Sequence, residues 1–141
     1  MAVPHLACMV AVAAFYGLPP RVLPAIQAVE GGQVGTVGRN RDGSEDLGVM
    51  QVNTRWLGPI AQLTALPEAT VRERLTADAC FNIAAAGAIL HSHLQQSNGD
   101  LMRAVGNYHS RTPELHEAYA ARVLDAAARL FGADRGADRR R

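Results

Sequence analysis

The sequence predicts a mainly α-helical protein with a single domain. Its length of 141 residues suits one domain with a substantial core. Hydrophobic residues make up 48% of the chain but aromatic residues only 5%, so small side chains, alanine above all, favour close helix packing over a sheet sandwich. Apolar residues recur at helical spacing, and glycine and proline separate the apolar segments.

The first two helices are predicted over residues 5–16 and 20–30. Gly17 and the following proline pair separate them, and Pro20 suits the first turn of a helix. The second helix ends in one acidic residue, and the apolar residues before it recur on one face: Val22, Leu23, Ile26 and Val29.

Glu30 is this acidic residue, and two glycines that terminate the helix follow it directly. A carboxyl group at the end of such a helix can lie in a cleft of low dielectric constant. Burial raises the pKa of a carboxyl group, which then suits it to act as a general acid near neutral pH. From this feature alone, a solvated glutamate at a helix end is the alternative.

A polar, glycine-rich loop is predicted over residues 33–47, and a short strand or hairpin is possible within it. Polar side chains alternate there as in a calcium-binding loop: Asn40, Asp42, Ser44 and Asp46. However, Gly43 and Gln51 stand at the wrong positions for an EF-hand, so specific calcium binding is not expected.

Five further helices are predicted over residues 48–57, 67–75, 79–96, 100–108 and 113–131. Thr76 or Asp78 can cap the helix that begins at residue 79, and Asp100 can cap the next one. Residues 132–141 lack apolar periodicity and end in three arginines, so we expect a disordered tail after a domain of residues 1–131.

Composition and charge exclude two classes of partner. The formal net charge is +1 and the arginines cluster on no predicted helix, so no nucleic-acid binding is expected. The apolar segment of residues 6–16 is too short to cross a bilayer, so no membrane span is expected. The same segment lacks the basic flank of a signal peptide and reads as an amphipathic first helix.

Three motifs, in this order, resemble those of the soluble lytic transglycosylase family. They are Glu30 at a helix end, the segment Gly48-Val49-Met50-Gln51-Val52-Asn53, and Tyr108 within Ala104-Val105-Gly106-Asn107-Tyr108-His109-Ser110. The resemblance spans most of the chain and implies a lysozyme-like, goose-type fold, with the glycine-rich loop or a small hairpin at the cleft. The Tyr-His-Ser-x-Thr-Pro form of the third motif is similar to the branch associated with secretion and conjugation machines.

The resemblance implies cleavage of the MurNAc–GlcNAc β-1,4 bond of peptidoglycan glycan strands. Glu30 would protonate the leaving oxygen and then deprotonate the C6 hydroxyl of the same sugar, which leaves a 1,6-anhydroMurNAc end. The family needs neither a second carboxylate nor a cofactor. The resemblance assigns substrate binding to Gly48, Met50, Gln51, Asn53 and Tyr108, although core packing is equally open for Met50.

Two features bear on how well the family pattern fits. The serine that commonly follows the catalytic glutamate is Gly31 here, so Tyr108 or a backbone amide must orient the carboxyl group. By the family position, Cys8 and Cys80 are expected to form a disulfide, whereas two reduced thiols are the alternative. No metal site is expected, because the two histidines nearest in sequence, His91 and His93, do not share a helix face.

Two alternatives to the transglycosylase remain open. If Glu45 or Asp46 reaches a water opposite Glu30, the enzyme is a hydrolytic lysozyme. A non-enzymatic peptidoglycan-binding assembly module is the other alternative. The resemblance also implies a periplasmic or exported protein that can serve a secretion, conjugation or pilus apparatus, so we expect that the sequence begins after a natural cleavage point, with Met1 added.

Overall fold

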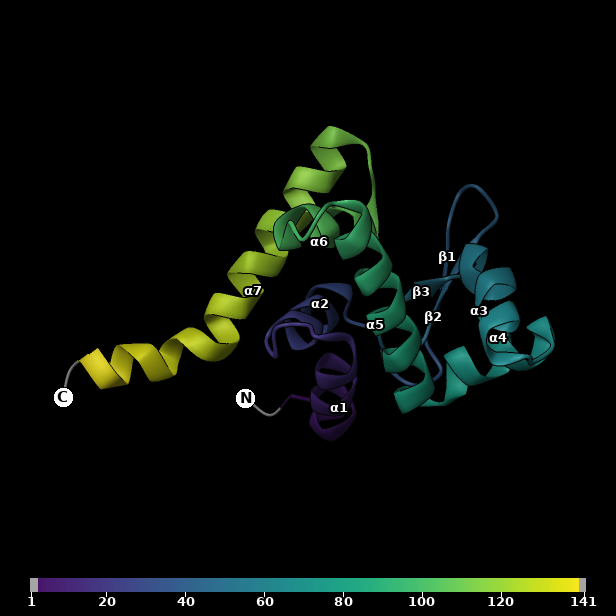
Figure 1. Ribbon diagram of the computed structural model, residues 1–141, viewed down its shortest axis with the longest axis horizontal. Coiled ribbons are helices and arrows are strands. Elements are labelled where there is room, and N and C mark those ends of the chain that lie inside the picture. The colour runs from purple at the N-terminus through teal and green to yellow at the C-terminus, as the bar shows by residue number, and fades with distance from the viewer. Residues whose placement is uncertain (1–2, 140–141) are drawn as a thin grey trace. The chain divides into compact units, whose positions relative to one another are not determined.

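The computed structural model describes residues 3–139 of the chain, and the side chains of residues 3–132. Over this range the chain forms seven α-helices and a small three-stranded sheet (Figure 1). The predicted mainly α, lysozyme-like fold class is confirmed. The chain divides into two compact units, of which one comprises residues 1–29 and 87–141 and the other comprises residues 30–86.

The first unit is helical. It contains α1 (Leu6–Tyr16), α2 (Val22–Glu30) up to its penultimate residue, the second half of α5 (Ala79–Gln96), α6 (Leu101–His109) and α7 (Pro113–Arg139). In α2 the predicted apolar face is buried at Val22, Leu23 and Ile26, while Val29 is half-buried. The N–H of Gly17, at a φ of 66°, closes the end of α1 by donating to the carbonyls of Ala13 and Ala14.

Helices α6 and α7 pack closely on one another (Figure 1). A Cβ atom at Gly106 would overlap the imidazole ring of His116, so the glycine lets the α7 histidine lie directly on the α6 backbone. The Nδ1 atom of the same histidine is 3.1 Å from the carbonyl oxygen of Ser110, in the connection between the two helices. The His116 side chain therefore contacts both the α6 backbone, where the two helices cross, and the loop that connects them.

The end of α7 differs from the predicted one. The helix extends to Arg139, so the predicted end near Phe131 is wrong. The predicted disorder of residues 132–141 falls largely on residues whose side chains lie outside the described part of the chain, so it stays a prediction. The assignment of residues 1–131 to one domain also stays a prediction.

The second unit contains the sheet and two short helices. Strands β1 (Val37–Arg39), β2 (Glu45–Leu47) and β3 (Val52–Asn53) are antiparallel in that order, and η1 (Thr54–Trp56), α3 (Leu57–Thr64), α4 (Glu68–Ala77) and the start of α5 follow. Val37 pairs with Leu47, and Asp46 pairs with Asn53. The possible hairpin in the glycine-rich loop is therefore present as β1 and β2.

The helix predicted over residues 48–57 is wrong. Residues 48–51 form a turn, β3 and η1 follow, and α3 begins only at Leu57. Gly48 and Gln51 have φ values of 69° and 53°, and residues in this left-handed conformation cannot continue a right-handed helix. Pro59 lies in the first turn of α3, where its missing N–H costs no hydrogen bond.

Capping side chains set the start of the two helices that follow. The carboxylate of Asp78 accepts a hydrogen bond of 3.0 Å from the N–H of Phe81 at the start of α5. Asp100 accepts one of 3.1 Å from the N–H of Arg103 at the start of α6. Both carboxylates satisfy N–H groups that have no partner inside the helix, as predicted.

A disulfide joins Cys8 of α1 to Cys80 of α5, since both cysteines are disulfide-bonded and the chain has no others. The predicted pairing is confirmed.

No helix in the described part of the chain is long and apolar enough to span a bilayer.

Candidate active site

Glu30 is the last residue of α2 and is half-buried, so its predicted place at a helix end is confirmed. Gly31 follows with a φ of 69° and ends the helix in the left-handed conformation. A serine would adopt this backbone only with strain, which is a physical reason for glycine at this position. The expected rise in the pKa of Glu30 stays a prediction.

Gly32 brings the segment after Glu30 against the second motif. This glycine is buried, and a Cβ atom on it would overlap the carbonyl oxygens of Gly48 and Val49. Only a residue without a side chain allows the two backbones to approach this closely. The first and second motifs are therefore neighbours within the second unit.

Asn82 of α5 holds the turn of the second motif in place, and sequence reasoning missed it. Its side chain is completely buried. The carbonyl oxygen accepts a hydrogen bond of 2.8 Å from the N–H of Met50, and the amide nitrogen donates to the carbonyls of Leu47 and Leu75, each at 2.8 Å. The available signal was an asparagine among the apolar and small residues at the start of α5.

Met50 and Gln51 are neighbours in this turn, but their side chains differ in burial. Met50 is fully buried, which favours the core-packing interpretation over a side chain that lines a cleft. Gln51 is half-buried, and its Nε2 atom donates a 2.9 Å hydrogen bond to the carbonyl of Gly48. The Gln51 carbonyl oxygen Oε1 lies close to Gly38 of β1, where an added Cβ atom would be 3.1 Å from it, and the role of Gln51 in substrate binding stays a prediction.

Asn53 is engaged in structure. Its Nδ2 atom donates to the Ser44 hydroxyl and to the Asp46 carboxylate, both at 3.0 Å, and its Oδ1 atom accepts from the N–H of Arg55 at the start of η1. Asn40 donates to the same Asp46 carboxylate at 3.2 Å. These bonds join the hairpin to β3 and occupy the side chain expected to bind sugar.

The two loop carboxylates of the lysozyme alternative also have partners. Glu45 forms ion pairs with Arg72 of α4 and, at 3.6 Å, with Arg39 of β1. Asp46 accepts the two asparagine amides already described. Hydrogen bonds from the hydroxyl and the N–H of Ser44 lower the pKa of the neighbouring Asp42 carboxyl, which stays ionised at neutral pH.

Tyr108 belongs to the first unit, where it is buried near the end of α6 with 8% of its surface exposed. The two residues after it serve the fold. The His109 ring stacks on the Tyr119 ring with a centroid distance of 4.7 Å. The Ser110 hydroxyl accepts a 3.0 Å hydrogen bond from the N–H of Thr112.

Two histidines pack within the first unit. His91 lies against the ring of Tyr16, with a centroid distance of 5.4 Å, and His116 lies on Gly106. Among the residues that the structure describes, no three side chains of the metal-ligating types come together.

Comparison with known proteins identifies the family. The model of the transglycosylase SLT domain matches residues 7–122, which is most of the chain. The chain therefore belongs to the SLT transglycosylase family, as the three motifs indicate.

Curated relatives show the same relationship. The invasion protein IagB of Salmonella typhimurium, from strains SL1344 and LT2, is 28% identical over 102 residues, which cover 70% of this chain and 60% of the relative. IagB of Salmonella typhi is 28% identical over 95 residues, which cover 64% of this chain and 56% of the relative. The match therefore spans less than two thirds of the length of these relatives.

Proposed function

We propose that this protein is a peptidoglycan lytic transglycosylase in which Glu30 is the only essential acid and base. The observation that carries the proposal is the close approach of Gly32 to Gly48 and Val49. It supports a site in which the carboxyl group at the end of α2 stands beside the turn of the second motif. Membership of the SLT family supports the same reaction and substrate.

The reaction needs one carboxyl group in two protonation states. A glycosidic oxygen leaves only when it is protonated, so Glu30 acts first as an acid. The resulting carboxylate then removes the proton of the C6 hydroxyl, and that oxygen attacks the anomeric carbon of the same muramoyl residue. The bond to the leaving sugar breaks, a C6–O–C1 bridge forms, and Glu30 regains its proton.

The state of the other carboxylates supports a transglycosylase over a lysozyme. An inverting hydrolase needs a second carboxylate free to activate water, and a retaining one needs it as a nucleophile. Glu45 is ion-paired with two arginines, and Asp46 accepts two amides. Using either as a base would break contacts that hold the hairpin to α4 or to β3.

The proposed place of action is the periplasm or the cell exterior, where peptidoglycan lies and where a disulfide persists. The Tyr-His-Ser-x-Thr-Pro form of the third motif supports local wall opening for a secretion, conjugation or pilus apparatus. The relatives named as invasion proteins are consistent with such a specialised role.

The test is mass spectrometry of the soluble products from purified sacculi. Wild-type protein releases anhydromuropeptides, and Glu30→Gln reduces the rate at least about a hundredfold, the usual effect of removing a general acid. Glu73→Gln changes an exposed carboxylate of α4 and is the matched control, expected to leave the rate unchanged. Products with reducing ends would show a lysozyme, and equal activity of Glu30→Gln would overturn the assignment.

A further inference from the structure

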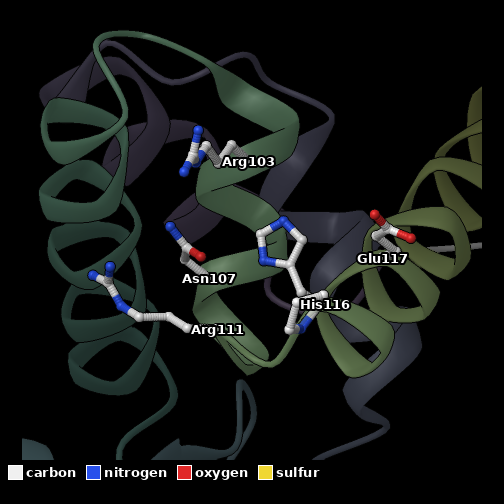
Figure 2. Close-up of a pocket in the computed structure, with 6 residues that line it drawn as sticks. Arg103, Asn107, Arg111, His116 and Glu117 are labelled. Atoms are coloured by element: carbon white, nitrogen blue, oxygen red, sulfur yellow. The ribbon is translucent and has the colours of Figure 1, made fainter.

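A polar pocket lies in the first unit, between α6 and the start of α7. Its volume is about 380 Å³, and six residues line it: Arg103, Asn107, Arg111, Pro113, His116 and Glu117 (Figure 2). The volume falls within the range of small-molecule sites. The transglycosylase reaction as proposed uses none of these side chains.

Three of the lining residues recur at an interval of four along the chain. Arg103 and Asn107 therefore lie on one face of α6, and Arg111 follows just beyond the end of the helix. Figure 2 shows the three side chains on the same side of α6, with Asn107 between the two guanidinium groups. The Arg111 guanidinium donates a 2.8 Å hydrogen bond to Gln96 of α5, which holds it in place and leaves its other N–H groups for a ligand.

Asn107 is the observation that points to a ligand. Only 9% of its surface is exposed, and its side chain hydrogen-bonds to none of the residues that the structure describes. Its amide is not among the fully buried polar atoms without a partner, so its nitrogen and oxygen reach the open space of the pocket. Asn82 and Asn53 find hydrogen-bond partners inside the protein, whereas Asn107 presents both a donor and an acceptor to the pocket.

The charges define the class of ligand. Two guanidinium groups favour a carboxylate or a phosphate, which they bind with paired N–H donors. Glu117 on the α7 side reduces the net charge of the pocket and disfavours a phosphate with two negative charges. The amide of Asn107 is complementary to another amide, to which it can donate and from which it can accept. A carboxylate next to an amide is the chemistry of a peptide that carries a free acid group.

We propose that the pocket of Arg103, Asn107 and Arg111 binds a free carboxylate and the adjacent amide of the stem peptide on the glycan strand. The inference rests on the proposed function for the identity of the substrate. It adds a peptide-reading site to an enzyme whose chemistry occurs on the sugar.

Direct binding tests the pocket without any need for catalysis. The probe is the free tripeptide L-Ala-γ-D-Glu-meso-diaminopimelate, titrated into the full chain by calorimetry. We expect saturable binding that weakens at least about tenfold in the variant with both Arg103→Gln and Arg111→Gln, since the variant loses the charge-assisted hydrogen bonds to the carboxylate. The control pair Arg41→Gln and Arg129→Gln removes the same charge from exposed sites and leaves the affinity unchanged.

Two further titrations fix the chemistry. The tripeptide with its carboxylates amidated is expected not to bind, and Asn107→Asp, which keeps the shape but adds a negative charge, is expected to abolish binding. No binding of the tripeptide to the wild type, or equal binding by the double arginine variant, would overturn the proposal. Inorganic phosphate that binds as tightly as the tripeptide would also overturn it, since the pocket would then be a general anion site.

Cleavage assays separate this proposal from the proposed function. With peptide-bearing sacculi, the double arginine variant raises KM about tenfold and leaves kcat unchanged. With strands stripped of peptides by an amidase, the variant and the wild type are equal. If the variant loses activity equally on both substrates, the pocket binds the lactyl carboxylate of the sugar, and the proposal of a stem-peptide site is overturned. If the wild type cleaves neither substrate, the proposed function fails, while the tripeptide titration still decides whether the pocket binds.

Discussion

Three buried or half-buried asparagines show how one side chain serves three purposes. Asn82 holds a backbone turn, Asn53 joins a hairpin to a strand, and Asn107 presents its amide to a pocket. The sequence distinguishes none of them, because the role depends on which backbone groups face the amide. The place of Glu30 at the end of α2, in contrast, was predictable, since an acidic residue between an apolar helix and two glycines is a local pattern.

Replacing Asn82 by alanine should lower the free energy of unfolding by about 3 kcal/mol. The substitution leaves an N–H and two carbonyls without their partner in a buried place, and each such loss costs about 1–3 kcal/mol before relaxation. Urea denaturation followed by circular dichroism measures the change. Gln95→Ala, at an exposed position of the same helix, is the control and should change stability by less than about 0.5 kcal/mol. A change as small for Asn82→Ala would contradict the role given to its amide.

The helices were largely predictable as elements, and the second motif was not. Proline and aspartate fixed the starts of α5, α6 and α7, because capping is a local interaction. Residues 48–57 look helical in sequence but form a turn and a strand. The N–H of Met50 bonds to Asn82, which is 32 residues away in the sequence, and such a distant partner leaves no local signal.

Gly106→Ala should destabilise the protein by about 1–3 kcal/mol, the usual cost of an added methyl group in a packed interface. The new Cβ atom would meet the His116 ring and force α6 and α7 apart. Thermal unfolding and urea titration of the variant measure this cost. Unchanged stability would mean that the ring moves freely and does not set the crossing of the two helices.

Gly132→Ala should act in the opposite direction. A Cβ atom at this position of α7 has no neighbour within 4 Å, so alanine adds only its better helix propensity, which is worth up to about 1 kcal/mol. A rise in helical content and unfolding temperature is the expected result. If neither quantity changes, the helix ends before Gly132 in solution, and the predicted disordered tail begins there.

The disulfide acts on the whole molecule. It closes a loop of about 70 residues, for which the chain-entropy model gives a stabilisation of about 4 kcal/mol. We therefore expect dithiothreitol to lower the unfolding midpoint of the wild type markedly. The variant with Cys8→Ser and Cys80→Ser should unfold at the midpoint of the reduced wild type and should not respond to the reductant. A response in that variant, or none in the wild type, would contradict this account.

For the whole molecule, the lysozyme-like fold class and the family could be predicted from the order of three motifs. The motifs are recognisable because the reaction requires particular residues in the site. The pocket between α6 and α7 could not be predicted from the sequence. Arg103 and Asn107 look like an ordinary polar helix face, and only the packing of α7 against α6 makes them the wall of a pocket.

The bond between Cys8 and Cys80 also makes stability depend on where the chain is. In a reducing compartment the two thiols stay apart, and a loss of about 4 kcal/mol lowers the ratio of folded to unfolded molecules roughly a thousandfold. For the proposed export, a chain that folds poorly before oxidation would stay open to translocation. Under the proposed function, oxidation in the compartment that holds peptidoglycan would complete the fold, so the disulfide would control when the enzyme becomes active.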